Sequence, residues 1–194
     1  AEYYLGSGKR LGVDSLSMLS LGTGVGHGII YGGRIFHGAN GLAGEAGHVT
    51  VEPDGELCNC GNYGCLEMYA TSKAIRRAAD RLAANGAQGL TRLLAEQEDA
   101  SAGDIYSLAI TGDADALSIF DRAGRALGIC IAALVNTLNP QLVVVAGGIS
   151  DAWPLLSPKM FQELELRSYI YRLTKPGSRF QRHTIVQKAT LGPD

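Results

Sequence analysis

The sequence has almost no net charge and no long hydrophobic run, and each absence argues against a class of function. Its 194 residues contain 17 lysines and arginines against 19 aspartates and glutamates, which gives a formal charge of −2. Binding to nucleic acids or anionic membranes depends on concentrated basic charge, which this composition lacks. The longest unbroken apolar run covers only residues 129–135, whereas a helix that spans a bilayer needs about 20 apolar residues. We therefore expect no membrane-spanning segment.

A secretory leader is also missing from the start of the printed sequence. We therefore expect a cytoplasmic protein whose cysteines are reduced. Hydrophobic residues make up 46% of the chain, which excludes intrinsic disorder. The first residue is Ala1 rather than Met, a helix-like stretch at 1–5 stops at Gly6, and Asp194 resembles the cap of a helix that does not follow. These features lead us to expect a chain cut at both ends.

Glycine, in contrast, is in excess. The chain has 26 glycines, and 16 of them fall between Gly6 and Gly64, although an average protein has only about 7% glycine. Glycine is the residue that permits tight turns and close backbone approaches. The first third of the chain must therefore contain backbone that turns sharply or lies against another group.

The hydrophobic patterns predict both strands and helices. Polar and apolar residues alternate over 15–21, which predicts a strand, and Gly32 and Gly33 between 29–31 and 34–36 predict a hairpin. Three further elements are predicted, namely a short strand at 48–51 and helices at 66–84 and 101–109.

The strongest pattern is an apolar face that repeats every three or four residues over 113–138. It predicts one long helix, which Asn139 and Pro140 end. The segment 141–146, which is apolar after Gln141, is typical of a fully buried strand, and helix followed by buried strand indicates an α/β layer architecture. Small residues along the helix are predicted to allow close packing on the sheet, namely Ala123, Gly124, Gly128 and Ala132.

Three cysteines crowd into eight residues, and a histidine lies ten residues upstream of the first. Cys58, Cys60, Cys65 and His48 together make a Cys₃His set, which is the closed coordination typical of structural zinc. The alternative is a disulfide between Cys58 and Cys65 with a spare thiol, which reducing surroundings disfavour. The fourth cysteine, Cys130, lies in the apolar run of the long helix and is predicted to be a buried hydrophobic residue.

Two glycine-rich segments are candidates for binding phosphate or nucleotide. The segment GTGVGHG at 22–28 has neither the lysine of a P-loop nor the G-x-G-x-x-G spacing. Alternating glycines nevertheless allow backbone N–H groups to converge on an anion, and a glycine-rich hairpin without a ligand is the alternative. Gly147 and Gly148 follow the buried strand, where a glycine pair marks either a ligand crevice or a turn.

Two carboxylates lie beside the predicted metal ligands. Glu45 comes three residues before His48, and Glu67 comes two residues after Cys65. If the metal site forms, both acids are drawn together, where they can accept hydrogen bonds from a polyol. The alternatives are a loop acid for Glu45 and a first-turn helix acid for Glu67.

Taken together, these segments resemble the ROK family of sugar kinases and sugar-responsive repressors. The resemblance rests on five segments of the sequence: LGTGVG at 21–26, GEAGH at 44–48, VEPDG at 51–55, CNCGNYGCLE at 58–67 and VVAGG at 144–148. It implies that residues 1–194 are the C-terminal lobe of a protein with a ribonuclease-H-like, actin/hexokinase-type fold and an inserted zinc knuckle. Members of the family commonly form homodimers.

The resemblance also implies roles for individual residues. Zinc is implied on His48, Cys58, Cys60 and Cys65, and sugar binding on Glu45, His48 and Glu67. The resemblance implies that the protein binds ATP together with Mg²⁺. It places the phosphates against Gly22, Thr23, Gly24, Gly26 and Gly28, and the adenosine near Gly147 and Gly148. The family's catalytic aspartate is expected upstream of Ala1, so this chain alone is expected to be inactive. His27 stands where the family usually has Gly or Ala, which leaves the fit around phosphate open.

Three functions follow from this resemblance and from the residues. The first is the sugar- and nucleotide-binding lobe of an ATP-dependent hexose 6-kinase of the glucokinase type. The second is the effector-binding lobe of a repressor, in which case a separate part of the protein would bind nucleic acid. The third is a zinc-stabilised interaction module. The intact glycine segment at 22–26 favours the kinase, whereas the identity of the sugar stays open.

Overall fold

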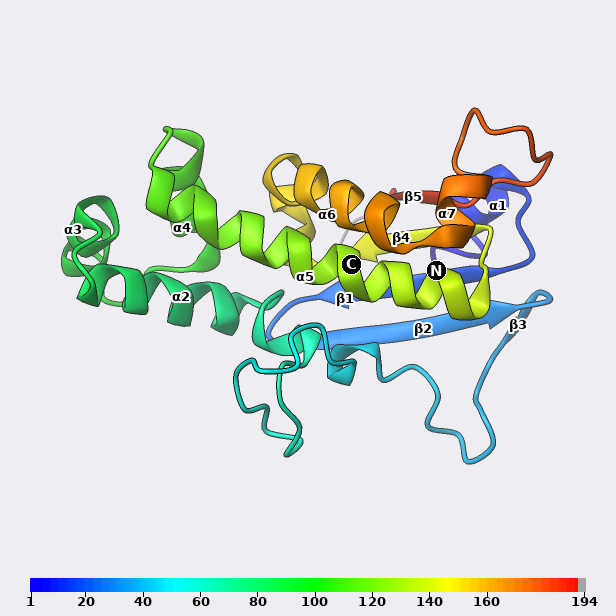
Figure 1. The fold of residues 1–194 in the computed structure, drawn as a ribbon, viewed down its shortest axis with the longest axis horizontal. Helices are drawn as coiled ribbons and strands as arrows, with labels where there is room; N and C mark the ends of the chain where they lie inside the picture. Colours follow the sequence, from blue (N-terminus) through cyan, green and yellow to red (C-terminus); the bar gives the residue numbers. More distant parts are fainter. Residues whose placement is uncertain (192–194) are drawn as a thin grey trace.

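Residues 1–191 are described in the computed structural model, and they build one mixed sheet with helices packed against it (Figure 1). The five strands lie in the order β3-β2-β1-β4-β5, with β1 antiparallel to β2 and parallel to β4. The strands are β1 (Leu16–Leu21), β2 (Val25–Tyr31), β3 (Arg34–Ile35), β4 (Leu142–Ala146) and β5 (Ile185–Lys188). The expected helix cap at Asp194 lies outside the described residues.

Seven α-helices and three 3₁₀ turns are assigned within residues 1–191. The α-helices are α1 (Ser7–Leu11), α2 (Ser72–Ala84), α3 (Gln88–Glu96), α4 (Ala102–Ile110), α5 (Ala114–Leu138), α6 (Trp153–Arg167) and α7 (Tyr169–Thr174). The 3₁₀ turns are η1 (Ala46–His48), η2 (Leu66–Met68) and η3 (Gly148–Ala152). None of the helices described between residues 1 and 191 is both long enough and apolar enough to span a membrane.

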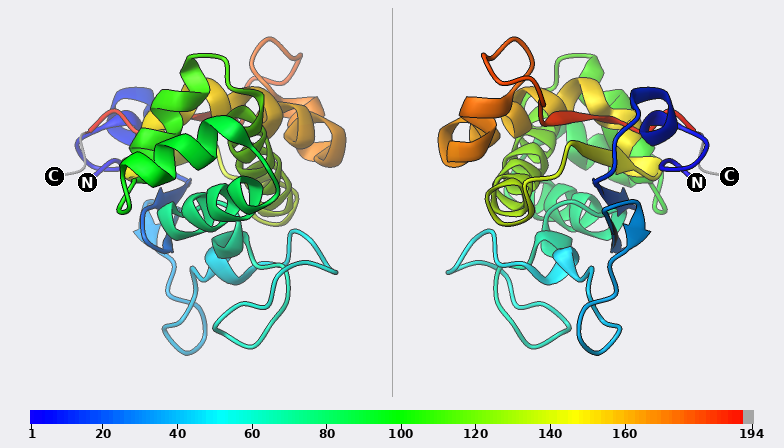
Figure 2. Two further views of the ribbon diagram at one scale, coloured as in Figure 1. Left: turned by 90° about the vertical axis from the view of Figure 1, so that its left-hand side faces the viewer. Right: turned by 90° about the vertical axis from the view of Figure 1, so that its right-hand side faces the viewer.

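Helices α5 and α6 cover one face of the sheet, while α2, α3 and α4 extend beyond its end (Figures 1 and 2). Leu19, Val143 and Val145 point from the strands into the main core, where Phe120 and Leu127 of α5 also lie. All five of these side chains are at most 1% exposed. Burial of this apolar face is the main source of stability for the domain.

The opposite face of the sheet is covered only in part. Leu16, Leu142 and Val144 form a second, smaller cluster there, and Tyr3 and Val13 of the N-terminal segment pack over it. Figure 2 shows this segment beside the red strand β5. The part of this face near the ends of β1 and β4 therefore stays open.

Several sequence predictions are confirmed. The predicted strands at 15–21 and 141–146 and the hairpin around Gly32 and Gly33 correspond to β1, β4 and the β2–β3 pair. The long helix begins at an Asp113 cap, whose side chain accepts a hydrogen bond from the Ala116 N–H at 2.9 Å. It ends at Asn139, which adopts the left-handed conformation with φ 45°.

Other predictions of secondary structure are wrong. Residues 1–5 form turns, and the first helix, α1, begins only at Ser7. The strand predicted at 48–51 is absent from the described chain, where η1 and a single bridge between Thr50 and Cys65 replace it. The predicted helix at 66–84 is interrupted after η2, because the Thr71 side chain caps a new helix, α2.

Gly124 and Gly128 of α5 face α6 rather than the sheet. A Cβ atom added to Gly124 would lie 2.3 Å from the Leu156 carbonyl oxygen, and one added to Gly128 would lie 2.4 Å from the Met160 carbonyl oxygen. Both oxygens belong to the α6 backbone. The prediction that these glycines allow close packing on the sheet is therefore wrong, because they allow two helices to approach each other.

Replacing Gly128 with Ala is expected to lower the free energy of unfolding by about 1–3 kcal/mol, because a backbone clash cannot be relieved by a rotamer change. Gly103→Ala in α4 is the matched control, since its new Cβ would meet only the Ser101 Oγ at 3.4 Å. That variant is expected to gain about 0.5–1 kcal/mol from reduced chain entropy. Urea denaturation measures both changes, and effects of the same sign would contradict the packing argument.

Candidate functional site

The four predicted metal ligands form one cluster. The side-chain ligand atoms of His48, Cys58, Cys60 and Cys65 all lie within 4.8 Å of one another. The His48 Nδ1 is 3.7 Å from the Cys58 Sγ, and the sulfur atoms of Cys60 and Cys65 are 3.6 Å apart. Ligands around a tetrahedral zinc ion are about 3.5–3.8 Å apart. The donor set therefore fits a zinc ion.

All four cysteines are free thiols, so the alternative of a Cys58–Cys65 disulfide is wrong. Burial raises the pKa of the Cys65 thiol to about 12, an effect that an adjacent cation would reverse. Cys130 is 0% exposed within the core, and burial raises its pKa to about 12 as well. This confirms Cys130 as a buried hydrophobic residue.

Ion pairs join the loop between the residues of this cluster to the helices. The Glu56 carboxylate lies 2.6 Å from the Arg81 guanidinium of α2 and also within 4.0 Å of Arg77 and Arg122. Glu52 accepts a hydrogen bond from Arg125 of α5 at 2.8 Å. These pairs are partly exposed and contribute little stability individually, but together they orient the knuckle on the domain.

The sugar-binding residues predicted by the resemblance come from two adjacent 3₁₀ turns. Glu45 precedes η1, and Glu67 lies in η2. The Leu66 N–H donates to the Val49 carbonyl at 3.0 Å, which holds the two turns side by side. The Glu45 side chain is exposed, whereas His48 and Glu67 are half-buried. The turns that carry these three residues are thus neighbours at the base of the knuckle.

Two glycines allow the η1 segment to lie directly on strand β2. A Cβ at Gly44 would be 2.5 Å from the His27 carbonyl oxygen, and one at Gly47 would be 2.8 Å from the Val25 carbonyl oxygen. Any larger residue would push Glu45 and His48 away from the sheet. Two of the many glycines of the sequence are therefore needed here so that this segment can contact β2.

The Glu67 carboxylate connects the predicted sugar site to the glycine turn. Its Oε2 accepts a hydrogen bond from the Val25 N–H at 3.0 Å and lies 3.0 Å from where a Cβ of Gly24 would be. The Gly22 carbonyl in turn accepts a hydrogen bond from the Ser72 N–H at the start of α2, at 2.9 Å. The turn is therefore fixed on one side by η2 and on the other by α2.

The glycine segment at 22–28 is not a single loop. Only Gly22, Thr23 and Gly24 form the turn, because β2 begins at Val25. Gly26 and Gly28 are exposed on the open face of the sheet, opposite Ser20 and Met18. The prediction of one phosphate-binding loop over 22–28 is therefore corrected. Gly26 and Gly28 belong to strand β2 and leave its surface without side chains.

His27 points to the helix side of the sheet. It lies opposite Leu19, which belongs to the main core, and its Nε2 is 2.8 Å from the Oγ of fully buried Ser17. Burial lowers the pKa of His27 to about 4, so the imidazole is neutral at physiological pH. The side chain therefore leaves the open face of β2 free.

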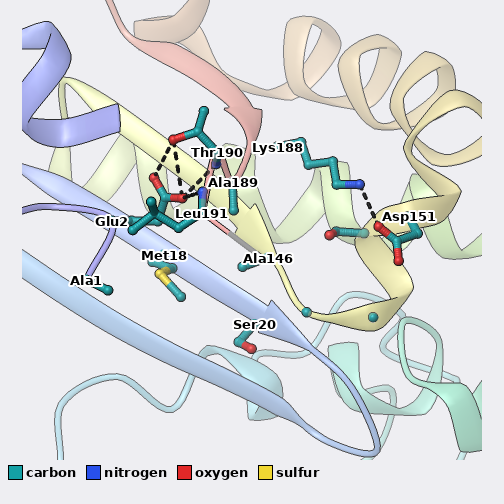
Figure 3. A pocket seen from close by; sticks show the side chains of 13 residues that line it. Ala1, Glu2, Met18, Ser20, Ala146, Asp151, Lys188, Ala189, Thr190 and Leu191 are labelled. Carbon is teal, nitrogen blue, oxygen red and sulfur yellow. Dashed lines mark hydrogen bonds and ion pairs between the residues drawn. The ribbon is translucent and has the colours of Figure 1, made fainter. Parts of the chain in front are cut away.

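A pocket of about 370 Å³ lies where the parallel strands β1 and β4 end (Figure 3). Gly147 and Gly148 form part of its lining, beside Ser20 and Lys188. Gly147 has φ 85°, and a Cβ there would be 2.3 Å from the Leu21 carbonyl oxygen, so the two strand ends touch. Ligands of open α/β sheets bind at such carboxyl ends of strands. The pocket and the glycine turn share this edge.

Sequence reasoning missed several residues of this pocket. Lys188 and Asp151 form an ion pair of 2.6 Å across one side, and Glu2 and Thr190 form another side (Figure 3). No sequence pattern singled out Glu2, and only the structure shows that a Cβ added to Gly6 would lie 2.5 Å from its carboxylate. No local sequence pattern predicts a contact between residues at opposite ends of a chain.

The chain is similar to curated proteins of two kinds, a glucokinase and a transcriptional regulator. The chain is 38% identical to a glucokinase of Halalkalibacterium halodurans over 195 residues, which covers 100% of this chain and 56% of that protein. It is 41% identical to the DNA-binding transcriptional dual regulator NagC of Escherichia coli over 158 residues, which covers 81% of this chain and 37% of that protein. The chain thus spans about half the length, or less, of these two curated relatives.

A solved structure shares the fold. A ROK family glucokinase from Streptomyces griseus, in complex with glucose and AMPPNP, superposes with a TM-score of 0.79 at 32% identity and covers 98% of this chain and 60% of that one. The mixed sheet and this likeness confirm the α/β class and the actin/hexokinase-like fold. The family model described as the ROK family matches residues 1–190. The chain therefore belongs to the ROK family.

Proposed function

We propose that this chain is the sugar- and nucleotide-binding lobe of an ATP-dependent hexose 6-kinase of the glucokinase type. The observation that carries the proposal is the hydrogen bond from the Val25 N–H to the Glu67 carboxylate at 3.0 Å. It joins the base of the knuckle to the glycine turn, so a sugar at one and a phosphate at the other would be neighbours. Glucose and AMPPNP occupy the Streptomyces griseus glucokinase, which supports both ligand classes.

We infer that His48, Cys58, Cys60 and Cys65 hold one zinc ion. Such an ion would fix the knuckle as a structural centre. The His48 Nδ1 faces Cys58, which leaves the other ring nitrogen for a sugar hydroxyl. Glu45 and Glu67 would accept hydrogen bonds from further hydroxyls, because ionised carboxylates act only as acceptors.

The nucleotide is proposed to lie along the edge shared by the two glycine turns. The exposed Thr23 hydroxyl and the backbone N–H group of Gly24 would hold phosphate oxygens, whereas the Gly22 N–H donates to the Gly24 carbonyl at 3.0 Å and so closes the turn. Gly26 and Gly28 leave the strand beside them bare, so nothing on this side blocks a triphosphate and its Mg²⁺. The pocket around Gly147 and Gly148 would receive the adenosine.

Transfer of the phosphoryl group requires a base for the attacking sugar hydroxyl. Glu45 and Glu67 are assigned to the sugar, and the family resemblance implies an aspartate upstream of Ala1. We propose that this aspartate accepts the proton of the sugar 6-hydroxyl. The 6-oxygen then bonds to the γ-phosphorus of ATP, and ADP leaves. The 194-residue chain alone is therefore proposed to bind ligands without turning them over.

A repressor lobe is the second candidate, and the 41% identity to NagC is the observation that favours it. A repressor lobe needs to bind a sugar effector but has no need of ATP. Nucleotide binding therefore separates the two functions more sharply than sugar binding does.

Glu67→Gln is expected to weaken glucose binding at least about tenfold, because a site built to accept hydroxyl hydrogen bonds discriminates strongly against a lost acceptor. Calorimetric titration with glucose and with Mg²⁺–AMPPNP measures both affinities. Glu98→Gln, an exposed acid between α3 and α4, is the matched control and is expected to change neither. Unchanged glucose affinity in Glu67→Gln would contradict the assigned sugar site, and absence of AMPPNP binding to the unmodified chain would favour the repressor.

A further inference from the structure

We propose that Glu2 is a positioning residue for nucleotide binding: its buried carboxylate holds residues 190 and 191 in place as one wall of the pocket at Gly147 and Gly148. The inference rests on the nucleotide site of the proposed function. It concerns a residue that neither the motifs nor the resemblance brought forward.

The Glu2 carboxylate is buried and surrounded by hydrogen-bond donors. Only 4% of the residue is exposed. Its Oε2 accepts from the Ser7 N–H at 3.0 Å, and its Oε1 accepts from the N–H groups of Thr190 at 2.6 Å and Leu191 at 2.5 Å. The Thr190 hydroxyl adds a contact of 3.3 Å to Oε2. Both oxygens are thus committed to backbone groups from opposite ends of the described chain.

A chain of hydroxyl groups leads to the same carboxylate. The Gln187 side-chain amide of β5 donates to the Ser7 Oγ at 2.7 Å, and this oxygen lies 3.1 Å from the Thr190 Oγ1. With the amide as donor, the Ser7 hydroxyl is free to donate to Thr190, whose hydroxyl then donates to Glu2. The chain of donors thus ends at the ionised carboxylate, and the hydrogen bonds that Glu2 accepts lower its pKa despite its burial.

The contacts lie at the pocket itself. Glu2, Thr190 and Leu191 lie together on one side of it (Figure 3), and Gly147 and Gly148 also belong to its lining. Strand β5 ends at Lys188, so residues 190 and 191 have left the hydrogen-bonded ladder of the sheet. Their N–H groups are instead held by Glu2. The Glu2 carboxylate therefore fixes the position of residues 190 and 191 at the pocket.

A glutamate is required for this arrangement. A carboxylate offers acceptor sites on both oxygens, whereas a glutamine of the same shape replaces one oxygen by an N–H donor group. In Glu2→Gln, either the Ser7 N–H or the pair of N–H groups at Thr190 and Leu191 would therefore lose its acceptor. Gly6 matters as well, because a Cβ there would lie 2.5 Å from the carboxylate Oε2.

The test uses Glu2→Gln and a second variant, Gly6→Ala, which displaces the carboxylate without changing it. Titration with Mg²⁺–AMPPNP is expected to show about tenfold weaker binding in both variants, the effect of one lost buried hydrogen bond. Glucose affinity and zinc content are expected to stay unchanged. Amide hydrogen exchange at Thr190 and Leu191 is expected to accelerate. Glu96→Gln at the exposed end of α3 is the matched control and is expected to match the unmodified protein.

The outcomes separate this inference from the function on which it rests. If the unmodified protein binds AMPPNP and both variants bind it equally well, the role of Glu2 is overturned while the proposed function stands. Equal losses of AMPPNP and glucose affinity would show a general structural role and also overturn it. If Glu2→Gln fails to fold, Gly6→Ala decides by the same criteria. An unmodified protein that binds glucose but not AMPPNP would overturn the kinase assignment together with this inference.

Discussion

Removal of the metal ion by a chelator is expected to weaken hexose binding by at least about tenfold while the sheet stays folded. The reason is that the cluster lies between Ala46 and Met68, outside the strands, and none of its four side chains belongs to the main core. Loss of the ion would release His48 and the turns that carry Glu45 and Glu67, and an oriented polar group contributes affinity mainly through its fixed position. Sugar titration calorimetry, with circular dichroism on the same sample, measures affinity and fold together.

Matched cysteine variants make this prediction sharper. Cys65→Ser removes one of four ligands and is expected to lower the zinc content from about one ion per chain to well below that value. Cys130→Ala removes a cysteine that is buried in the core but is not a ligand, so its zinc content is expected to stay near one. Elemental analysis gives the stoichiometry. A folded, zinc-free sample that binds glucose as tightly as the loaded protein would contradict the proposed role of the metal.

Replacing Gly147 with Ala is expected to cost about 3 kcal/mol or more and to abolish nucleotide binding. The position combines a left-handed backbone, with φ 85°, and a Cβ site only 2.3 Å from the Leu21 carbonyl oxygen. Strain at such a residue costs about 1–3 kcal/mol, and the backbone clash adds to it because β1 and β4 are paired along their length. Separation of the strand ends would also open the pocket.

The neighbouring glycine provides the control for stability. No described atom lies within 4 Å of a Cβ built on Gly148, so Gly148→Ala is expected to keep the free energy of unfolding within about 0.5 kcal/mol of the original. Gly148 lines the same pocket, and its variant is therefore expected to reduce nucleotide affinity without loss of stability. Urea denaturation and AMPPNP titration separate the two effects. Equal stability of the two variants would contradict the account of the turn.

Elements with a strong periodic pattern could be predicted from the sequence. The helix α5 and the strand β4 are continuous apolar segments whose ends carry clear signals, the Asp113 cap and the Asn139–Pro140 stop. Elements formed by tertiary contacts could not be predicted. The segment 48–51 has strand-like residues, but the surrounding knuckle holds it in η1 and one bridge to Cys65. In such segments, ligand geometry and close approach outweigh local propensity.

The candidate site divides in the same way. The Cys₃His cluster could be predicted because three cysteines lie within eight residues, and the structure brings the more distant His48 to them. The connection between Glu67 and the glycine turn joins residues 42 positions apart, and the contact of Glu2 with Leu191 joins residues 189 apart. No periodicity carries such information. Roles of Glu45, His48 and Glu67 in sugar binding came from the resemblance and stay predictions until binding is measured.

Homodimer formation also stays a prediction. Several large apolar side chains are exposed at the β2–β3 hairpin and the loop after it, namely Tyr31, Ile35, Phe36 and Leu42. Exposed apolar groups of this kind are typical of contact surfaces. Sedimentation at several protein concentrations would determine the oligomeric state, and it has no bearing on the assignment of the sugar site.

The most direct test of the central claim is a coupled kinase assay of the full-length gene product with glucose, ATP and Mg²⁺. We predict ATP-dependent phosphorylation of glucose, which the unmodified protein shows and Glu67→Gln largely loses. The 194-residue chain assayed alone is predicted to bind glucose and AMPPNP without turnover. Full-length protein that binds glucose, fails to bind AMPPNP and produces no sugar phosphate would contradict the kinase assignment.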